Sequence, residues 1–372
     1  MQRLLLPLAL ILAGACHPAA GLVVQSATDL GPQAQGASIK GRDGGYSVLF
    51  DGVSVWDYGD SILSVAGVDG SSWRNNTMSW TSDLTVADGI SGYQQSVDAN
   101  GAPYEFIPQT AEEQAYNTAH ADVDTNGDGV SDCTDPCGAR EAIWPSAMVV
   151  DPASGTALIF YAKIHGEPGA WNFYGLGRGI ATWDSLTAEP IRTDVSPAPD
   201  PADPTLLWLG EGVTPGDAAL LVGANVYAYS CNADSADKTC RLARAPFANA
   251  LDLSAWAWWD GSTWSPDITQ ATGIFVGAPQ LSIHYAATLG VYLAVYMDSV
   301  SGEMVARTAP APEGPWSDPV TLLTGVAPYS GFLYAGMAHP EYEVGGTEFL
   351  SYYRSTGDWT GEIRLATVTL SR

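Results

Sequence analysis

The sequence predicts an all-β fold, and within that class a five-bladed β-propeller. The chain holds 40 Gly and 24 Pro among its 372 residues, and few segments repeat apolar residues at helical spacing. Short runs rich in Val, Ile, Tyr, Trp and Phe instead alternate with turn residues, which is the pattern of β-strands. Repeated antiparallel hairpins without long helices are typical of sandwiches, barrels and propellers.

The spacing of the hairpins favours the propeller among these three. We expect strands at residues 46–50, 53–58, 147–150, 157–162, 219–222, 225–230, 291–297 and 349–354. They fall into hairpin groups near residues 43–90, 140–195, 205–260, 270–325 and 330–370, which makes about five blades of the usual length. Long inserts lie between groups at 95–140 and 190–205, and the second is a stiff, Pro-rich surface connection.

The N-terminus has the pattern of an export signal. A short n-region containing Arg3 precedes an apolar stretch at 4–12 and small residues at 13–15, which lead into Cys16. An apolar stretch this short is a secretory signal rather than a spanning helix. The Cys after Leu-Ala-Gly-Ala reads as a lipobox, so we expect lipidation of Cys16; an ordinary cleaved signal with an incidental Cys is the alternative.

These features divide the chain as follows. We expect residues 1–16 to be a lipoprotein signal with Cys16 as the mature N-terminus, 17–40 a tether and first strand, and 41–372 the propeller. The protein would be exported and held by acyl chains on the membrane of the bacterial cell envelope or outer surface.

Charge and motif content exclude several function classes. Asp and Glu number 41 against 15 Lys and Arg, a net charge of −26. Such a field repels nucleic acid and anionic polymers, so we expect no nucleic-acid partner. The sequence holds no nucleophile elbow, phosphate-binding loop or His-Glu metal helix, and we expect no organic cofactor.

Four cysteines remain after Cys16: Cys133, Cys137, Cys231 and Cys240. In an exported chain they indicate two disulfides, with three possible connectivities. Proximity in the sequence favours Cys133–Cys137 and Cys231–Cys240. A thiolate metal site is the rival, but no second Cys or His pair stands nearby at zinc spacing.

Residues 124–135, within the first insert, have the spacing of a calcium loop. Oxygen side chains fall at positions 1, 3, 5, 9 and 12, with Gly at position 6 and a backbone carbonyl at position 7. The expected Ca²⁺ ligands are Asp124, Asn126, Asp128, the carbonyl of Val130, Asp132 and Asp135. Because position 12 is Asp and not Glu, the loop resembles thrombospondin type 3 and dockerin repeats, and we expect a structural ion. A solvated acidic turn is the alternative.

The first hairpin contains two aspartates that the strand register would bring together. Asp51-Gly52 is a two-residue hairpin turn, and pairing Phe50 with Val53 makes partner numbers sum to 103. Asp43 then lies opposite Asp60, with Cβ atoms ~5 Å apart on one face.

Two carboxylates this close do not ionise independently, so one pKa rises, and a raised acid beside an ionised base is what glycoside hydrolysis requires. A bulge at Gly44 or Gly45 would shift the register. The alternative is that Asp43 and Asp60 are turn residues at strand ends, where Asp is common.

A series of motifs resembles the family catalogued as domain of unknown function 4185. The first-blade motifs are Gly41-Arg-Asp43-Gly-Gly-Tyr-Ser47, Trp56-Asp-Tyr-Gly-Asp60-Ser and Arg74-Asn-Asn-Thr-Met78. Further matches follow in the same order at 144–145, 240–244, 255–261, 307–308, 314–316 and 339–341. Together they span about 41–355.

The resemblance implies a five-bladed propeller related to arabinan- and fructan-degrading glycosidases, some of them endo-acting D-arabinofuranosidases. It implies that Asp43 and Asp60 match the two first-blade aspartates at the mouth of the central channel. It also implies substrate contacts at that mouth from Arg74, Asn75, Asn76, Trp144, His339 and Glu341. Ser61 in place of Thr, and Asp57-Tyr58 in place of an apolar-aromatic step, depart from the family pattern, which leaves the fold inference intact but not the particular substrate.

The leading hypothesis is a surface-anchored glycoside hydrolase that acts on a furanose-containing polysaccharide of arabinan type. One of Asp43 and Asp60 would be the general acid and the other the general base. Two alternatives stay open: a non-catalytic carbohydrate-binding lipoprotein, and a structural propeller that binds protein through its acidic loops. The expected partners are a poly- or oligosaccharide and, through the lipid anchor, a membrane.

Overall fold

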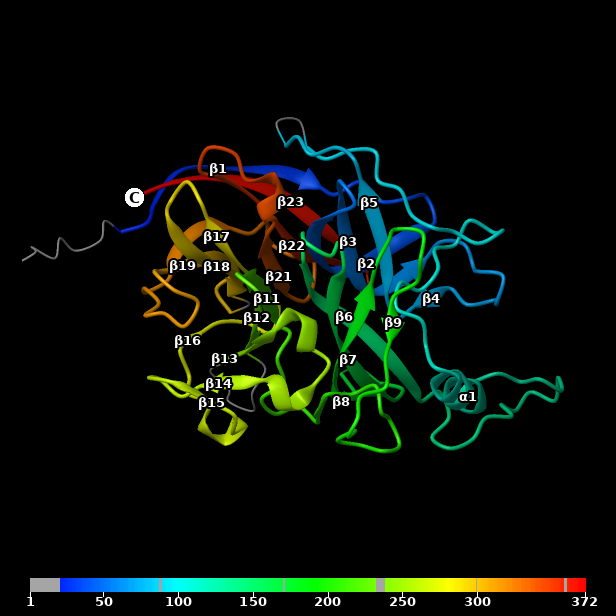
Figure 1. Cartoon of the computed structure of the whole chain (residues 1–372). Helices are drawn as coiled ribbons and strands as arrows, with labels where there is room; N and C mark the ends of the chain where they lie inside the picture. Colours follow the sequence, from blue (N-terminus) through cyan, green and yellow to red (C-terminus); the bar gives the residue numbers. More distant parts are fainter. Residues whose placement is uncertain (1–20, 87–88, 170, 232–237, 299, 358–359) are drawn as a thin grey trace, which may run out of the picture.

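The computed structural model describes residues 21–86, 89–169, 171–231, 238–298, 300–357 and 360–372 (Figure 1). The predicted signal and Cys16 lie outside these residues. Within them, no helix is both long enough and apolar enough to span a membrane.

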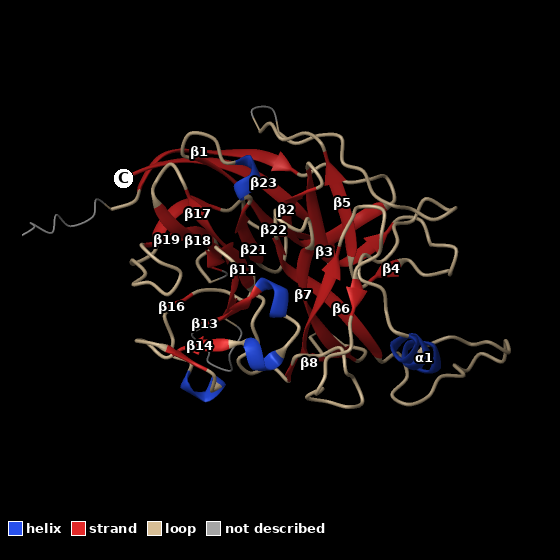
Figure 2. Ribbon diagram, viewed as in Figure 1, coloured by secondary structure: helices blue, strands red, loops and turns tan. Residues whose placement is uncertain are grey.

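Five antiparallel sheets surround a central axis, so the predicted all-β, five-bladed propeller is confirmed (Figures 1 and 2). Blade 1 contains β2 (Ile39–Phe50), β3 (Val53–Leu63), β4 (Trp73–Arg74) and β5 (Thr77–Thr81). Blade 2 contains β6 (Arg140–Val150), β7 (Ala157–Gly166), β8 (Phe173–Trp183), β9 (Ile191–Arg192) and β10 (Trp208–Leu209). Blade 3 contains β11 (Ala218–Val222), β12 (Asn225–Ser230), β13 (Thr239–Pro246), β14 (Ala257–Trp259), β15 (Trp264–Ser265) and β16 (Phe275–Val276).

Blade 4 contains β17 (Leu281–Ala286), β18 (Val291–Asp298), β19 (Glu303–Ala309) and β20 (Val320–Thr324). Blade 5 contains β21 (Leu333–Ala338), β22 (Thr347–Gly357) and β23 (Thr360–Ser371), and it is completed by β1 (Val23–Pro32). Because β1 pairs with β23 along its length, the two ends of the chain close the ring (Figure 1). The first strands of the blades, β2, β6, β11, β17 and β21, contact one another in turn and form the central wall.

Large aromatic side chains fill the spaces between blades. Phe50 of blade 1 stacks on Trp183 of blade 2 with ring centroids 4.3 Å apart, and both are buried. Trp208 of blade 2 meets Trp256 of blade 3 edge to face at 5.1 Å. Burying each such ring contributes on the order of 2 kcal/mol, so much of the chain's aromatic content serves the fold and not a ligand.

The insert between blades 1 and 2 carries the α-helix α1 (Ala111–His120), which lies at the edge of the molecule (Figure 2). Thr110 and Glu113 form a capping box that starts the helix. The Glu113 carboxylate also pairs with Arg192 at 2.6 Å and with Lys163 at 3.1 Å, both on blade 2. This buried ion network fixes the helix against the propeller. Four 3₁₀ turns complete the described elements: Phe247–Asn249, Leu253–Ala255, Ile268–Gln270 and Pro340–Tyr342.

The register of the first hairpin follows the prediction from Phe50–Val53 as far as Tyr46–Asp57. It shifts on both sides of Gly44, which pairs with Tyr58 and not with Gly59. Gly44 and Gly45 both have positive φ, +81° and +110°, which a glycine adopts without strain. The prediction that Asp43 pairs directly with Asp60 is therefore wrong: a bulge lifts Asp43 out of the ladder.

Candidate active site

Two cavities occupy the two ends of the central channel. The larger, about 1180 Å³, is lined by residues of all five blades, among them Asp43, Trp144 and Tyr334. The smaller, about 460 Å³, is lined by the opposite ends of the same inner strands and includes Glu341. Tyr46 lines both cavities, so it lies between them. We call the larger one the upper cavity and the smaller one the lower cavity.

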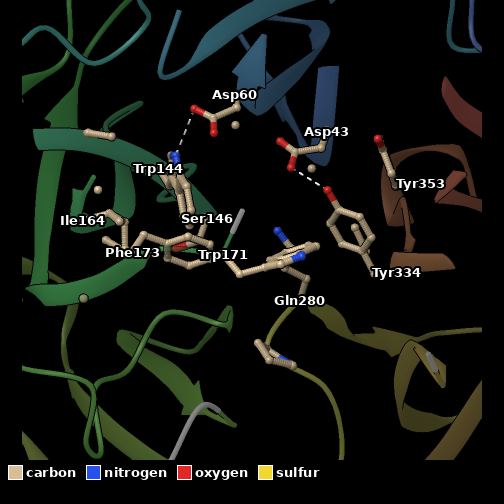
Figure 3. Close-up of a pocket in the computed structure, with 18 of the residues that line it drawn as sticks. Asp43, Asp60, Trp144, Ser146, Ile164, Trp171, Phe173, Gln280, Tyr334 and Tyr353 are labelled. Atoms are coloured by element: carbon tan, nitrogen blue, oxygen red, sulfur yellow. Dashed lines mark hydrogen bonds between the residues drawn. The ribbon is translucent and has the colours of Figure 1, made fainter. Parts of the chain in front are cut away.

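Asp43 lies in the wall of the upper cavity, where the bulge in β2 turns its carboxylate inward (Figure 3). A Cβ atom at Gly59 would lie 2.6 Å from Asp43 Oδ1, so the absence of a side chain at Gly59 leaves room for the carboxylate. The hydroxyl of Tyr334, on blade 5, donates a hydrogen bond to Oδ2 at 2.5 Å. Burial raises the pKa of Asp43 to about 7, the charge of Asp60 adds to the rise, and the Tyr334 hydrogen bond opposes it.

Asp60 lies in the same cavity but has a different set of partners. Trp73 Nε1 and Trp144 Nε1 donate to its Oδ1 at 3.1 and 3.3 Å, and the Arg140 guanidinium contacts its Oδ2 at 3.3 Å. Burial raises the pKa of Asp60 above its usual value, and Arg140 and the two indole donors offset only part of this rise. Arg140 also lies over the Trp73 ring, 4.8 Å from its centroid. Three N–H donors thus oppose the rise of the Asp60 pKa, whereas among the described residues the Tyr334 hydroxyl is the side-chain donor that opposes the rise at Asp43.

Asp43 and Asp60 therefore differ in the way that general acid–base catalysis requires. A carboxyl that holds its proton near neutral pH serves as a proton donor, and a neighbour with more N–H donors to stabilise its ionised form serves as a base or nucleophile. The charge of Asp60 raises the pKa of Asp43, which agrees with the prediction that the two carboxylates influence each other. They do so because a bulge in β2 places Asp43 in the cavity, and not because the two residues are a direct cross-strand pair.

A buried ion pair supports the wall below these residues. Arg178 lines the upper cavity and pairs with Asp217, which is completely buried. Asp217 also accepts a hydrogen bond from the backbone N–H of Cys231 at 2.6 Å, and its carbonyl accepts one from the Tyr46 hydroxyl at 2.8 Å. These contacts link blades 1, 2 and 3 around the floor of the cavity.

Of the six predicted substrate contacts, Trp144 lines the upper cavity, where it holds Asp60. Arg74, Asn75 and Asn76 are buried and do not line it. Arg74 donates to the carbonyl of Pro103 at 2.9 Å. Asn75 donates to Glu105 at 3.0 Å, and Asn76 bonds to the backbone of residues 106, 107 and 143. The expected place of these three at the channel mouth is wrong, because their polar groups fasten the insert to blade 1 and, through Asn76, blade 1 to β6 of blade 2.

His339 and Glu341 lie away from the aspartates as well. His339 is completely buried, stacks on Trp56 at 4.0 Å and bonds to Ser47 and Ser351 through its two ring nitrogens. Burial lowers its pKa to about 3, so the imidazole is neutral. Glu341 accepts hydrogen bonds from Ser47 and Ser54 and lines the lower cavity. The expectation that both lie at the mouth beside Asp43 is therefore corrected.

Sequence reasoning missed the residues that hold the two aspartates, other than Trp144. Trp73 stands directly before the predicted Arg74 motif, and Arg140 is the first residue of β6, the strand that carries Trp144, so proximity to a motif was a usable signal for both. Nothing in the sequence points to Tyr334, because it comes from blade 5 and meets Asp43 only through closure of the ring.

Both predicted disulfides, Cys133–Cys137 and Cys231–Cys240, are present. The loop at 124–135 is exposed and folds on its own hydrogen bonds: Asp124 accepts from the N–H groups of Gly127 and Gly129, and Asp132 from Thr125. Among the described residues, no three carboxylates of this loop lie within 4.8 Å of one another. Calcium binding therefore stays a prediction.

Comparison with known proteins supports the fold assignment. Residues 187–359 match the family model described as domain of unknown function (DUF4185). The match to DUF4185 confirms the resemblance inferred from the motifs, over the segment from the end of blade 2 to blade 5. The first-blade motifs, with Asp43 and Asp60, precede the matched segment. No curated protein sequence matches the chain.

Among solved structures, a candidate hydrolase from Bacteroides ovatus ATCC 8483 aligns with a TM-score of 0.58 at 14% identity, over 89% of this chain and 87% of that one. This alignment shows a shared fold. The RS223 β-xylosidase aligns at 0.48 and 10% identity, over 88% and 92% of the two chains. A GH43_1 enzyme from Xanthomonas citri aligns at 0.47 and 13% identity, over 92% and 89%.

Proposed function

We propose that this protein is a lipid-anchored glycoside hydrolase that cleaves a furanose-containing polysaccharide of arabinan type. The observation that carries the proposal is that two aspartates with different surroundings line one cavity. Asp43 has a pKa of about 7, and Asp60 accepts hydrogen bonds from three N–H donors. The choice of a furanose glycan rests on the resemblance to the DUF4185 family and not on this geometry.

The two aspartates then have distinct roles. Asp43 is the general acid: it gives its proton to the glycosidic oxygen as the bond to the anomeric carbon breaks. Asp60 is the base: it takes a proton from the water whose oxygen bonds to the anomeric carbon. Two carboxylates acting in this way on an oxocarbenium-like transition state are sufficient for hydrolysis without a cofactor.

The cavity is suited to a neutral glycan. Its volume of about 1180 Å³ is enough for a few sugar units, and aromatic rings and single polar groups line it together. The net charge of −26 disfavours anionic polysaccharides.

A glycan panel tests the proposal. The soluble domain without residues 1–16, supplied with calcium, would be incubated with arabinan, arabinogalactan and fructan, and products read by chromatography. We expect new oligosaccharides or sugars from the wild type and from Asp318→Asn, an exposed aspartate on blade 4, but none from the Asp43→Asn and Asp60→Asn double variant. Saturable glycan binding without any product would favour the non-catalytic carbohydrate-binding alternative, and no glycan binding the protein-binding one.

A structural Ca²⁺ in the 124–135 loop is part of the proposal. The spacing of six oxygen ligands supports it, and binding would turn the carboxylates of Asp124, Asp128 and Asp132 from the loop's own N–H and hydroxyl groups toward the ion. Chelation by EDTA should then lower the melting temperature and expose the loop to protease, and added calcium should restore both. If neither changes, the loop holds no ion.

Lipidation at Cys16 is the remaining part. The first strand begins at Val23, so a tether of residues 17–22 would keep the propeller within about 20 Å of the membrane surface. The full-length chain should pellet with membranes and the Cys16→Ser variant should not. Equal solubility of the two would contradict lipidation.

A further inference from the structure

A continuous row of six aromatic rings runs along the upper cavity, and it includes Trp144, which donates to Asp60, and Tyr334, which donates to Asp43. We call it the aromatic arch; its members are Trp144, Phe173, Trp171, Phe332, Tyr334 and Tyr353, and all six line the cavity. Successive ring centroids are 5.2, 6.3, 5.4, 5.3 and 4.5 Å apart. Figure 3 shows Trp144 and Phe173 on one side, Tyr334 and Tyr353 on the other, and Trp171 between them.

The middle of the arch joins two blades that are not neighbours. Trp171 belongs to the connection between β7 and β8 of blade 2, and Phe332 directly precedes β21 of blade 5. Blade 1, which carries both aspartates, stands between blades 2 and 5 in the ring. Ring centroids 5.4 Å apart mean that the two side chains touch, which leaves no space for a sugar between them.

Trp171 is held in this position at a cost. It is 66% exposed and its φ is +60°, a left-handed conformation that is unfavourable for a bulky residue. Backbone strain combined with exposure of a large apolar ring is typical of a residue that serves a ligand and not the core.

The arch changes what the cavity can accept. A glycan bound by its interior must enter on one side of the two carboxylates and leave on the other. Blade 1 forms the wall behind the two carboxylates. The arch passes in front of them, from Trp144 beside Asp60 to Tyr334 beside Asp43, so the carboxylates lie between blade 1 and the arch. A chain end, in contrast, needs a single opening, and the exposed faces of Trp171 and Phe332 offer it rings on which sugar C–H groups can stack.

Resting on the proposed glycan-hydrolase function, we propose that the upper cavity takes the end of a glycan chain, and that Trp171 and Phe332 are the residues that exclude chain interiors. The enzyme is accordingly exo-acting, whereas some of the relatives implied by the sequence resemblance are endo-acting.

The first test compares the fall in polymer size with the number of reducing ends released from the glycan that the panel identifies. Wild type should release small sugars from the outset with little fall in polymer size. Trp171→Ala and Phe332→Ala should each increase the fall in polymer size per reducing end several-fold, and Tyr285→Ala, an exposed aromatic on blade 4 outside the cavity, should not. A ladder of long oligosaccharides from wild type at the outset would overturn the inference while leaving hydrolysis established.

The second test does not need turnover. The Asp43→Asn variant would be titrated with one glycan cut to several mean lengths. If chain ends are recognised, the apparent Kd expressed per chain end is the same for every glycan length. With Trp171→Ala in the same background, the Kd per chain end should vary with glycan length, because chain interiors can then bind as well. A Kd that is constant per sugar unit means interior binding and overturns the inference even if the proposed hydrolysis fails. Absence of binding at every length overturns both proposals.

Discussion

The Tyr334 hydroxyl donates a 2.5 Å hydrogen bond to Asp43 and so connects the last blade of the propeller to the first at the candidate active site. The two residues are 291 positions apart in the sequence. Asp43 has its raised pKa in spite of this hydrogen bond, because burial and the charge of Asp60 outweigh it.

Replacing Tyr334 by Phe should raise the pKa of Asp43 further. The hydroxyl stabilises the ionised carboxylate, so its loss favours the protonated form. With Asp43 as the acid, the alkaline limb of the kcat/KM profile should move up by about 0.5–1 pH unit. The pH–rate profile measures this, with Tyr285→Phe as the control. If the alkaline limb does not move, the ionisation that causes it belongs to a group other than Asp43.

Arg140→Gln should act on the opposite limb. Arg140 favours the ionised form of Asp60, so its removal raises the pKa of that carboxyl. Because the base must be ionised, the acid limb of kcat/KM should shift upward by about 1 pH unit, and activity should recover as the pH is raised. A uniform loss of activity at every pH would mean that Arg140 acts on substrate binding alone.

Asp57→Leu should stabilise the protein at neutral pH. Both carboxylate oxygens of Asp57 are buried without a hydrogen-bond partner among the described residues, and burial raises its pKa well above the usual value. The native state therefore keeps a proton that the unfolded chain releases above about pH 4, so this group lowers stability progressively as the pH rises. Removing it should add about 1–3 kcal/mol at pH 7.

The stabilisation by Asp57→Leu should be smaller at pH 4 than at pH 7, and thermal unfolding at the two pH values measures the difference. An equal or lower melting temperature at pH 7 would show that the carboxyl has a partner in solution.

Glu113→Gln should loosen the insert. The substitution removes one member of a buried network and leaves Arg192 with less compensation, at a cost of about 3 kcal/mol. We expect a lower melting temperature and faster proteolysis of the segment that contains α1. Glu112→Gln, on the exposed side of the same helix, is the matched control and should behave like wild type.

The fold was predictable because each propeller blade is a local series of strands and tight turns that can be recognised in the sequence. Asp51-Gly52 and the turns like it punctuate strands at regular spacing, and that spacing does not depend on long-range contacts. The register of the first hairpin failed at Gly44 and Gly45, where two glycines adopt backbone angles that a strand pattern does not encode.

The site was only partly predictable, for a related reason. Asn76 and His339 are residue types that bind ligands, yet they bind backbone and serine hydroxyls here, and a motif does not distinguish the two uses. The Tyr334–Asp43 hydrogen bond and the Trp171–Phe332 contact join segments of different blades that meet only when the ring closes.

The most direct measurement is the rate of product release by Asp43→Asn and Asp60→Asn, each alone, on the glycan that the panel identifies. Asp318→Asn serves as the control, and thermal melting verifies that each variant is folded. Each active-site substitution should lower kcat by a factor on the order of 10²–10⁴, the usual contribution of a positioned acid or base. A folded Asp43→Asn or Asp60→Asn variant with the wild-type rate would contradict the assignment of that residue to the chemistry.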